Sequence, residues 1–169
     1  MAIAVNNIPV IREALNKYGI NNLKLQNSIL AVIGKESAFK PQSENLNYKT
    51  ADRIKKVFSS IPAAVVPSLV ANPVGLGNYV YSNKYGTPPG AGYLYRGRGL
   101  NQITFLDNYK KVGQQIGVDL VKNPDLLNKI EYAAPAAAVF YRDGIKTYKN
   151  VLKNKYGVDL TAIQPTDDY

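Results

Sequence analysis

Residues 95–109 read YRGRGLNQITFLDNY, and few of their side chains suit the packing of a hydrophobic core. The run RGRG at residues 96–99 gives a backbone that can take positive φ angles and approach a ligand closely. Neutral donors and acceptors surround it, and they suit a ligand covered with hydroxyl and amide groups, such as a polysaccharide. The other interpretation is a solvated glycine loop before a helix. The hydrogen-bonding side chains of this stretch are Asn101, Gln102, Thr104 and Asn108.

The composition excludes several catalytic chemistries. The chain has 169 residues, no histidine and no cysteine. A Ser-His-Asp triad, a cysteine nucleophile and a zinc site built from histidine or cysteine are therefore excluded. An enzyme of this composition transfers protons with carboxylate, lysine or tyrosine side chains, and we expect no metal and no cofactor. Without cysteine there are no disulfides, which fits folding in a reducing cytoplasm.

The charge of the chain favours anionic partners. Its net charge of +9 at pH 7 attracts nucleic acid, anionic lipid or a cell wall that carries acidic polymers. No apolar run approaches the roughly 20 residues that span a bilayer. The N-terminal stretch MAIAVNNIPVIREALNK lacks a basic start and does not resemble a secretory signal. The 13 tyrosines provide flat rings for stacking on sugars or bases, or else fill the core.

Hydrophobic periodicity predicts a mainly helical single domain with long connecting loops. Thr50 and Thr104 are placed to cap helices with their hydroxyl groups, and Gly117 is placed to end one. Residues 60–92 contain five prolines and should form loops and short helical turns. The predicted helices cover residues 8–18, 25–39, 50–58, 104–116, 131–142 and 145–155, the last two forming a pair around Gly144.

Two of the four glutamates are candidates for catalysis. Glu13 and Glu131 lie in ordinary polar helix settings and should be surface residues. Glu36 falls on the predicted apolar stripe of its helix, three residues after Ile33. Partial desolvation there would raise the pKa of its carboxyl and suit a general acid. The alternative is a buried glutamate paired with lysine or arginine.

Glu44 follows Glu36 by eight residues, beyond the helix break at Pro41. A loop at this position can fold back across the helix end, so that two carboxylates flank a cleft. One carboxylic acid that protonates the leaving oxygen and one carboxylate that activates water are sufficient to hydrolyse a glycosidic bond. The alternative for Glu44 is an ordinary solvated loop residue.

Several segments together resemble bacteriophage lysins related to the glycoside hydrolase family 19 chitinases. The resemblance covers about residues 25–142 and preserves the order and rough spacing of the motifs. The motifs that carry it are KESAF at 35–39, ENLNY at 44–48, YRGRGLNQIT at 95–104 and DNY at 107–109, continued by GVDLVKNPDLL at 117–127 and AAVFY at 137–141.

This resemblance implies a two-lobed, lysozyme-like fold with a cleft between the lobes, formed by one catalytic domain over residues 1–169. It implies Glu36 as the general acid, Glu44 as the second carboxylate and Thr104 as the residue that positions the attacking water. The alternative for Thr104 is helix capping, and that for Arg98 is a structural counter-ion to a cleft carboxylate. The implied substrate-binding residues are Gln102, Asn108, Tyr48, Tyr95, Arg98 and Tyr109.

The chain departs from the family pattern in three respects. Lys35 stands where the family commonly has histidine, and the Glu36–Glu44 spacing is one residue shorter than in related lysins, which leaves the identity of the base open. The disulfides and longer loops usual in the chitinases are missing, which favours peptidoglycan over chitin as substrate.

The expected function is therefore a muramidase-type peptidoglycan hydrolase that cleaves β-1,4 bonds with inversion. Such a protein either stays in the host cytoplasm until it is released to the wall or belongs to a virion with other phage proteins as partners. The alternatives are a chitinase, a non-catalytic wall-binding or baseplate component, and a basic helical nucleic-acid-binding domain. Charge alone supports the last alternative, so we expect no specific nucleic-acid partner.

Overall fold

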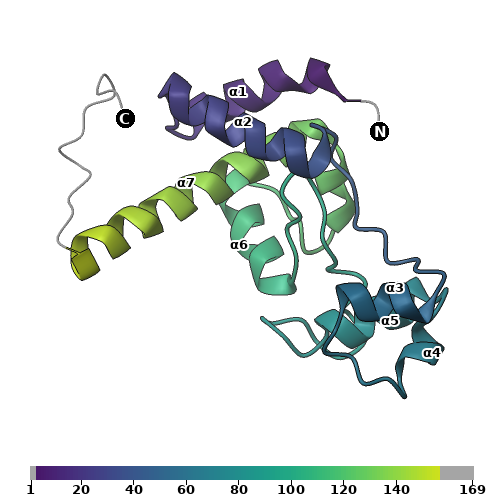
Figure 1. Cartoon of the computed structure of the whole chain (residues 1–169). Helices are drawn as coiled ribbons and strands as arrows, with labels where there is room; N and C mark the ends of the chain where they lie inside the picture. Colours follow the sequence, from purple (N-terminus) through teal and green to yellow (C-terminus); the bar gives the residue numbers. More distant parts are fainter. Residues whose placement is uncertain (1–2, 157–169) are drawn as a thin grey trace.

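The computed structural model describes residues 3–156, and this part of the chain is mainly helical, as predicted (Figure 1). Its only β-structure consists of two isolated bridges, Lys84–Thr87 and Arg98–Ile103. The elements in chain order are η1 (Val5–Asn7), α1 (Ile8–Lys17), α2 (Leu23–Ser37), α3 (Ala51–Val57), α4 (Val66–Leu69), α5 (Pro73–Tyr81), α6 (Leu106–Ile116), η2 (Pro124–Asn128) and α7 (Ile130–Tyr156).

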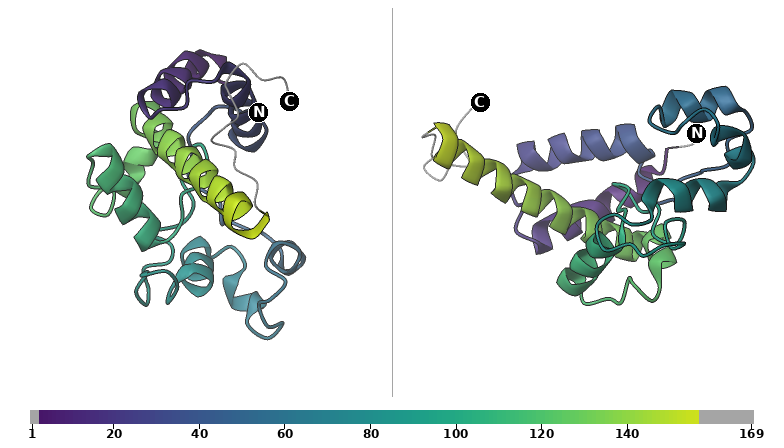
Figure 2. Two further views of the ribbon diagram at one scale, coloured as in Figure 1. Left: turned by 90° about the vertical axis from the view of Figure 1, so that its left-hand side faces the viewer. Right: turned by 90° about the horizontal axis from the view of Figure 1, so that it is seen from below.

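The helices form two lobes. In Figure 1, α3, α4 and α5 gather at the lower right, apart from α1, α2, α6 and α7, and both views of Figure 2 show the same separation. The small lobe has its own apolar core, and α4 and α5 provide the short helical turns predicted for residues 60–92. That core consists of Leu46, Ile54, Ile61, Val66, Leu69 and Leu76.

The core of the large lobe lies where α7 packs against α1 and α2. Four alanines of α7 are fully buried there, and their small side chains let the helices approach closely. They are Ala133, Ala134, Ala137 and Ala138. A second cluster joins α6 to α7 through Tyr109, Val112 and Val139.

The prediction of two helices around Gly144 is wrong. Residues 130–156 form one helix, α7, which also contains Pro135. One glycine costs a helix only about 1 kcal/mol relative to alanine, which is too little to end the helix by itself. Figure 2 shows that the C-terminal half of α7 projects away from the small lobe.

The predicted helix ends agree with the structure where a local signal decides them. Gly19 follows α1 with φ 84°, and Gly117 ends α6 with φ 72°. Thr50 caps α3, its hydroxyl oxygen accepting a hydrogen bond from the Arg53 amide at 3.4 Å. Glu13 and Glu131 are exposed, as predicted.

Thr104 does not cap α6, contrary to the prediction. The helix begins at Leu106, and its N-cap Phe105 makes no side-chain capping bond. The Thr104 hydroxyl instead donates to the Gln102 carbonyl at 3.0 Å. The buried hydroxyl of Thr87 accepts from the Leu106 amide at 3.0 Å, so a residue distant in the sequence satisfies the first turn.

Candidate active site

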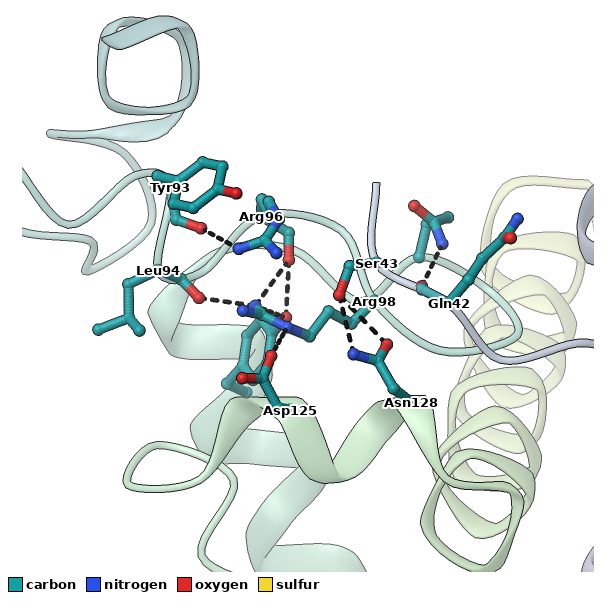
Figure 3. A network of polar contacts seen from close by, with 10 residues as sticks. Gln42, Ser43, Tyr93, Leu94, Arg96, Arg98, Asp125 and Asn128 are labelled. Carbon is teal, nitrogen blue, oxygen red and sulfur yellow. Dashed lines mark hydrogen bonds and ion pairs between the residues drawn. The ribbon is translucent and has the colours of Figure 1, made fainter. Parts of the chain in front are cut away.

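The loop at residues 94–103 folds around the buried side chain of Arg98, which is 2% exposed (Figure 3). Its Nε donates to Asp125 Oδ1 at 2.8 Å, and its Nη1 donates to the Leu94 carbonyl at 2.6 Å. The same Nη1 donates to the Tyr109 hydroxyl at 2.9 Å. A planar guanidinium with several donors can hold such a loop from within.

Tyr95, Arg98 and Tyr109, which are expected to bind substrate, are all buried in the structure. Tyr95 is 7% exposed and donates to the Val121 carbonyl at 3.3 Å. Tyr109 is fully buried and donates to the Arg96 carbonyl at 2.7 Å; burial raises its pKa to about 12, although Arg98 acts in the opposite direction. These side chains brace the loop from inside, because their polar atoms are already bonded within the protein.

Arg98 is also not the counter-ion of either candidate carboxylate. Its ion-pair partner is Asp125 of η2, whose side chain is 76% exposed. Arg98 is therefore a structural counter-ion, as in the alternative interpretation, but the acid that it pairs with is Asp125.

The loop at residues 94–103, called the arginine-glycine loop below, is hydrogen-bonded to the segment that carries Glu44. Gly99 donates to the Gln42 carbonyl at 3.1 Å, and the Glu44 amide donates to the Gly97 carbonyl at 2.8 Å. The Gln102 side chain adds a bond from Nε2 to the Gln42 carbonyl at 3.2 Å, which Figure 3 shows beside the label of Gln42. Two motifs that are far apart in the sequence thus lie side by side.

Gly97 lets the Gln102 side chain lie close against the loop backbone. A Cβ atom there would lie 2.6 Å from the side-chain oxygen of Gln102, closer than real Cβ contacts. Gln102 itself has φ 54°, a left-handed conformation that is uncommon outside glycine. The surrounding bonds therefore hold the amide of this exposed residue in a defined place.

The carboxylate of Glu44 is held by Tyr81 of α5. The Tyr81 hydroxyl lies 2.9 Å from both Oε1 and Oε2 of Glu44. Burial and the charge of Glu44 raise the pKa of Tyr81, so its hydroxyl stays protonated and donates. Tyr48 is half-buried close by, and burial followed by the charge of Glu44 raises its pKa as well. Sequence reasoning missed Tyr81, since no motif marks it within the loop-rich stretch 60–92.

Glu36 is exposed, so the prediction that it is partly desolvated is wrong, and so is the alternative of a buried ion pair. The buried residue of the last turn of α2 is its neighbour Ser37, four positions after Ile33. The buried face of the helix is thus offset by one residue from the predicted stripe. Tyr141 of α7 is half-buried, and its pKa is raised by burial and then by the nearby charge of Glu36.

The turn after α2 directs the chain from Glu36 towards Glu44. Ala38 and Phe39 both have positive φ angles, 50° and 60°. The Phe39 ring packs against Gly34, where a Cβ atom would lie 2.8 Å from it. Asn7 donates to the Phe39 carbonyl at 2.9 Å, which ties this turn to the start of α1.

Thr104 and Asn108 lie side by side. The exposed Asn108 side chain donates through Nδ2 to the Thr104 carbonyl at 2.8 Å. The intervening Phe105 packs its ring edge-on against Tyr81, with centroids 5.6 Å apart. This segment is therefore linked to Glu44 through Phe105 and Tyr81, and the catalytic and substrate-binding roles assigned to Thr104, Asn108, Gln102 and Tyr48 stay predictions.

A pocket of about 620 Å³ lies elsewhere, between the α1–α2 turn and α7, and contains none of the predicted site residues. Within residues 3–156, no group of three or more Asp, Glu, His or Cys side chains is placed to hold a metal ion. In the same part of the chain, no helix is long and apolar enough to cross a membrane.

Comparison with known proteins places this arrangement in a family. The family model described as class I chitinase of glycoside hydrolase family 19 matches residues 71–154. A Haemophilus influenzae protein named as a glycosyl hydrolase family 19 domain-containing protein is 30% identical over 139 residues, which cover 78% of this chain and 68% of that protein.

Two plant proteins match a shorter stretch. A basic endochitinase of Vitis vinifera and chitinase 3 of Oryza sativa subsp. japonica are each 55% identical over 40 residues, or 24% of this chain. The stretch covers only 13% and 12% of the respective plant proteins. The extended match to the Haemophilus protein and the match to the family model agree with the mainly helical fold, and the chain belongs to glycoside hydrolase family 19.

Proposed function

We propose that this glycoside hydrolase cleaves the β-1,4 glycosidic bonds of bacterial peptidoglycan as a muramidase. The observation that carries the proposal is the fixed carboxylate of Glu44, held by Tyr81 and by the backbone of Gly97. Glu36 lies exposed on the last turn of the preceding helix, where a bound polymer can reach it.

Glu36 serves as the general acid and Glu44 as the general base in the proposed reaction. The Glu36 carboxyl protonates the glycosidic oxygen as the bond to the anomeric carbon breaks. Water attacks that carbon from the opposite face and passes its proton to the Glu44 carboxylate. Thr104 positions this water, and the amides of Gln102 and Asn108 bind the sugar.

The mechanism inverts the anomeric configuration, and we expect the two carboxyl groups to be separated by more than roughly 6.5 Å, which leaves room for water. Covering of Glu36 by substrate would then supply the desolvation that the free protein lacks. Proton NMR of the first product tests the stereochemistry: an α anomer supports inversion, and a β anomer indicates a retaining enzyme.

Charge and composition favour peptidoglycan as the substrate. A net charge of +9 draws the chain to a wall that carries acidic polymers, whereas chitin is neutral. The chain also lacks the cysteines needed for the disulfides usual in family 19 chitinases. A lysin role in a bacteriophage, free in the host cytoplasm or attached to other virion proteins, is part of this proposal.

Chitin hydrolysis is the second candidate, favoured by the similarity to the two plant chitinases. Mass analysis of fragments released from purified peptidoglycan, run beside chitin oligomers, separates the two. New reducing ends on N-acetylmuramic acid support the muramidase. Cleavage of chitin oligomers alone would establish a chitinase, and binding to walls without any release would indicate a wall-binding component.

A further inference from the structure

An aromatic side chain stands exposed on a short loop beside the proposed site. Tyr85 is 69% exposed, and its ring packs tilted against Phe105 with centroids 4.8 Å apart. Phe105 in turn contacts Tyr81, the residue that holds Glu44. Three rings therefore run in a row from the candidate base to the surface.

The loop that carries Tyr85 is held in an unfavourable backbone conformation. Asn83, Tyr85 and Gly86 have φ angles of 59°, 43° and 74°. The positive φ of Gly86 favours glycine there, and a Cβ atom would displace the side-chain carboxylate of Asp107. Such left-handed conformations persist only where the surrounding structure enforces them, and they concentrate at functional sites.

Several bonds enforce this conformation. The Asn83 amide donates to the Thr87 carbonyl at 2.8 Å, and the Thr87 amide donates to the Lys84 carbonyl at 2.9 Å. The Asp107 amide donates to the Tyr85 carbonyl at 3.1 Å, which fastens the loop to the first turn of α6. The position of the exposed ring is therefore set by the same segment of the chain, residues 104–108, that carries Thr104 and Asn108.

Phe105 has an equally restricted backbone. Its φ of 72° with ψ of 145° is a conformation that almost only glycine adopts without strain. This conformation lets the Phe105 ring contact both Tyr81 and Tyr85. The strained backbones of Tyr85 and Phe105 thus both serve to place their rings in one aromatic surface, which extends from Tyr81 beside Glu44 to the exposed Tyr85.

We propose that Tyr85, backed by Phe105, is a stacking subsite for a pyranose ring of the glycan, remote from the bond that is cleaved. The C–H face of a pyranose packs on the negative face of an aromatic ring. Because Tyr81 and Phe105 lie between Tyr85 and Glu44, the subsite engages a sugar beyond those next to the reacting carbon. The subsite rests on the proposed function, since the glycan is the substrate of Glu36 and Glu44.

The test compares Tyr85→Ala, Tyr85→Leu and Tyr85→Trp on short and long β-1,4-linked N-acetylglucosamine oligomers and on solubilised peptidoglycan strands. For long glycans, Tyr85→Ala and Tyr85→Leu should raise KM about 3- to 10-fold with kcat unchanged, the range expected for one aromatic stacking contact. Tyr85→Trp should keep the KM of the unmodified protein. Tyr148→Ala removes an equally exposed tyrosine of α7, 61% exposed, and should change nothing.

A purely structural role for Tyr85 gives a different pattern. If the ring only supports Phe105, Tyr85→Leu keeps the KM for long glycans and the variants differ only in melting temperature. A loss that is equal for short and long glycans, or no loss with Tyr85→Ala, also overturns the subsite.

Measuring glycan binding to a catalytically inactive variant tests the Tyr85 subsite separately from the proposed hydrolysis. Calorimetric titration of Glu36→Gln with a long oligomer or strand should show binding that Tyr85→Ala weakens, whether or not the unmodified protein cleaves that glycan. Binding that is indifferent to Tyr85 overturns the subsite even if hydrolysis is intact. Weakened binding without any hydrolysis by the unmodified protein would overturn the proposed function and leave the subsite standing.

Discussion

The Tyr81 hydroxyl lies 2.9 Å from both carboxylate oxygens of Glu44. Tyr81 ends α5 of the small lobe, while the backbone of Glu44 is bonded to Gly97 in the arginine-glycine loop. The carboxylate is thus fixed from two sides by segments distant from it in sequence. A neutral phenol can serve as donor because its pKa is raised by burial and by Glu44 itself.

Replacing Tyr81 with phenylalanine should lower kcat/KM roughly 10- to 100-fold. A hydrogen bond to a charged group contributes about 1.5–3 kcal/mol, and about 1.4 kcal/mol corresponds to a tenfold change. Steady-state kinetics on solubilised peptidoglycan measures the effect. Tyr79→Phe removes a hydroxyl from an exposed residue of the same helix and is the matched control. Equal activity of the two variants would show that Tyr81 does not support the base.

Glu36→Gln should fold normally and lose nearly all hydrolysis of purified walls. The side chain is exposed, so the amide introduces no buried unpaired group, but it supplies no acid proton. Glu13→Gln changes an exposed glutamate of α1 and should keep full activity. Glu44→Gln should also abolish turnover with unchanged folding. Hydrolysis at the unmodified rate by Glu36→Gln would refute the assignment of the acid.

Thr104→Val should slow turnover while the free energy of unfolding falls by only about 0.5–1.5 kcal/mol, for the lost bond to the Gln102 carbonyl. Thr50→Val is the complementary control, because Thr50 is a true N-cap. It should destabilise the protein by about 0.5–2 kcal/mol without affecting kcat. Urea unfolding and kinetics on both variants test this. Unchanged kcat in Thr104→Val would mean that its hydroxyl does not position the water.

Tyr109→Phe should lower the free energy of unfolding by about 1–3 kcal/mol, because it removes a partner of the buried Arg98 guanidinium. The folded-state pKa of Tyr109 is about 12, above its ordinary value of 10.0. The stability that depends on the neutral phenol is therefore complete below pH 10 and is lost as the pH rises towards 12. Unfolding in urea across this range should show the difference between the unmodified protein and the variant shrinking.

Asp143→Asn should destabilise the protein at neutral pH and have little effect in strong acid. A hydrogen bond from Gln115, and then contacts with Arg142 and Lys111, lower the pKa of the Asp143 carboxyl below 3.8. Its contribution is present above the unfolded pKa and disappears as the pH falls through the lower folded value. We expect about 1 kcal/mol at most for such partly exposed pairs. A difference that persists at low pH would contradict this linkage.

The sequence alone determined the features that depend on neighbouring residues. Gly19 and Gly117 end helices because they adopt positive φ at little cost, and Thr50 caps α3 because its hydroxyl reaches an amide three residues on. The motif at residues 95–109 likewise indicated the helical family fold, because it occurs with the other family motifs in the expected order and at roughly the expected spacing. These signals act over a few residues or as a pattern along the chain.

Only the tertiary structure decided which of these side chains are buried and which groups they bond. Thr104 carries a good capping signal, yet Thr87 satisfies the first turn of α6 from another loop. Arg98 and Tyr109 have the chemistry of sugar binders, but the fold buries them as a brace.

The burial of Glu36 and the hydrogen-bond partner of Glu44 could also not be predicted from neighbouring residues in the sequence. Ser37, and not Glu36, is buried on the last turn of α2, because the packing of neighbouring segments sets which face of the helix is covered. Tyr81 meets Glu44 across 37 positions of sequence, and no periodicity or motif encodes such a contact. Residues so far apart in the sequence come within hydrogen-bonding distance only in the folded chain, because the tertiary structure alone brings the two segments together.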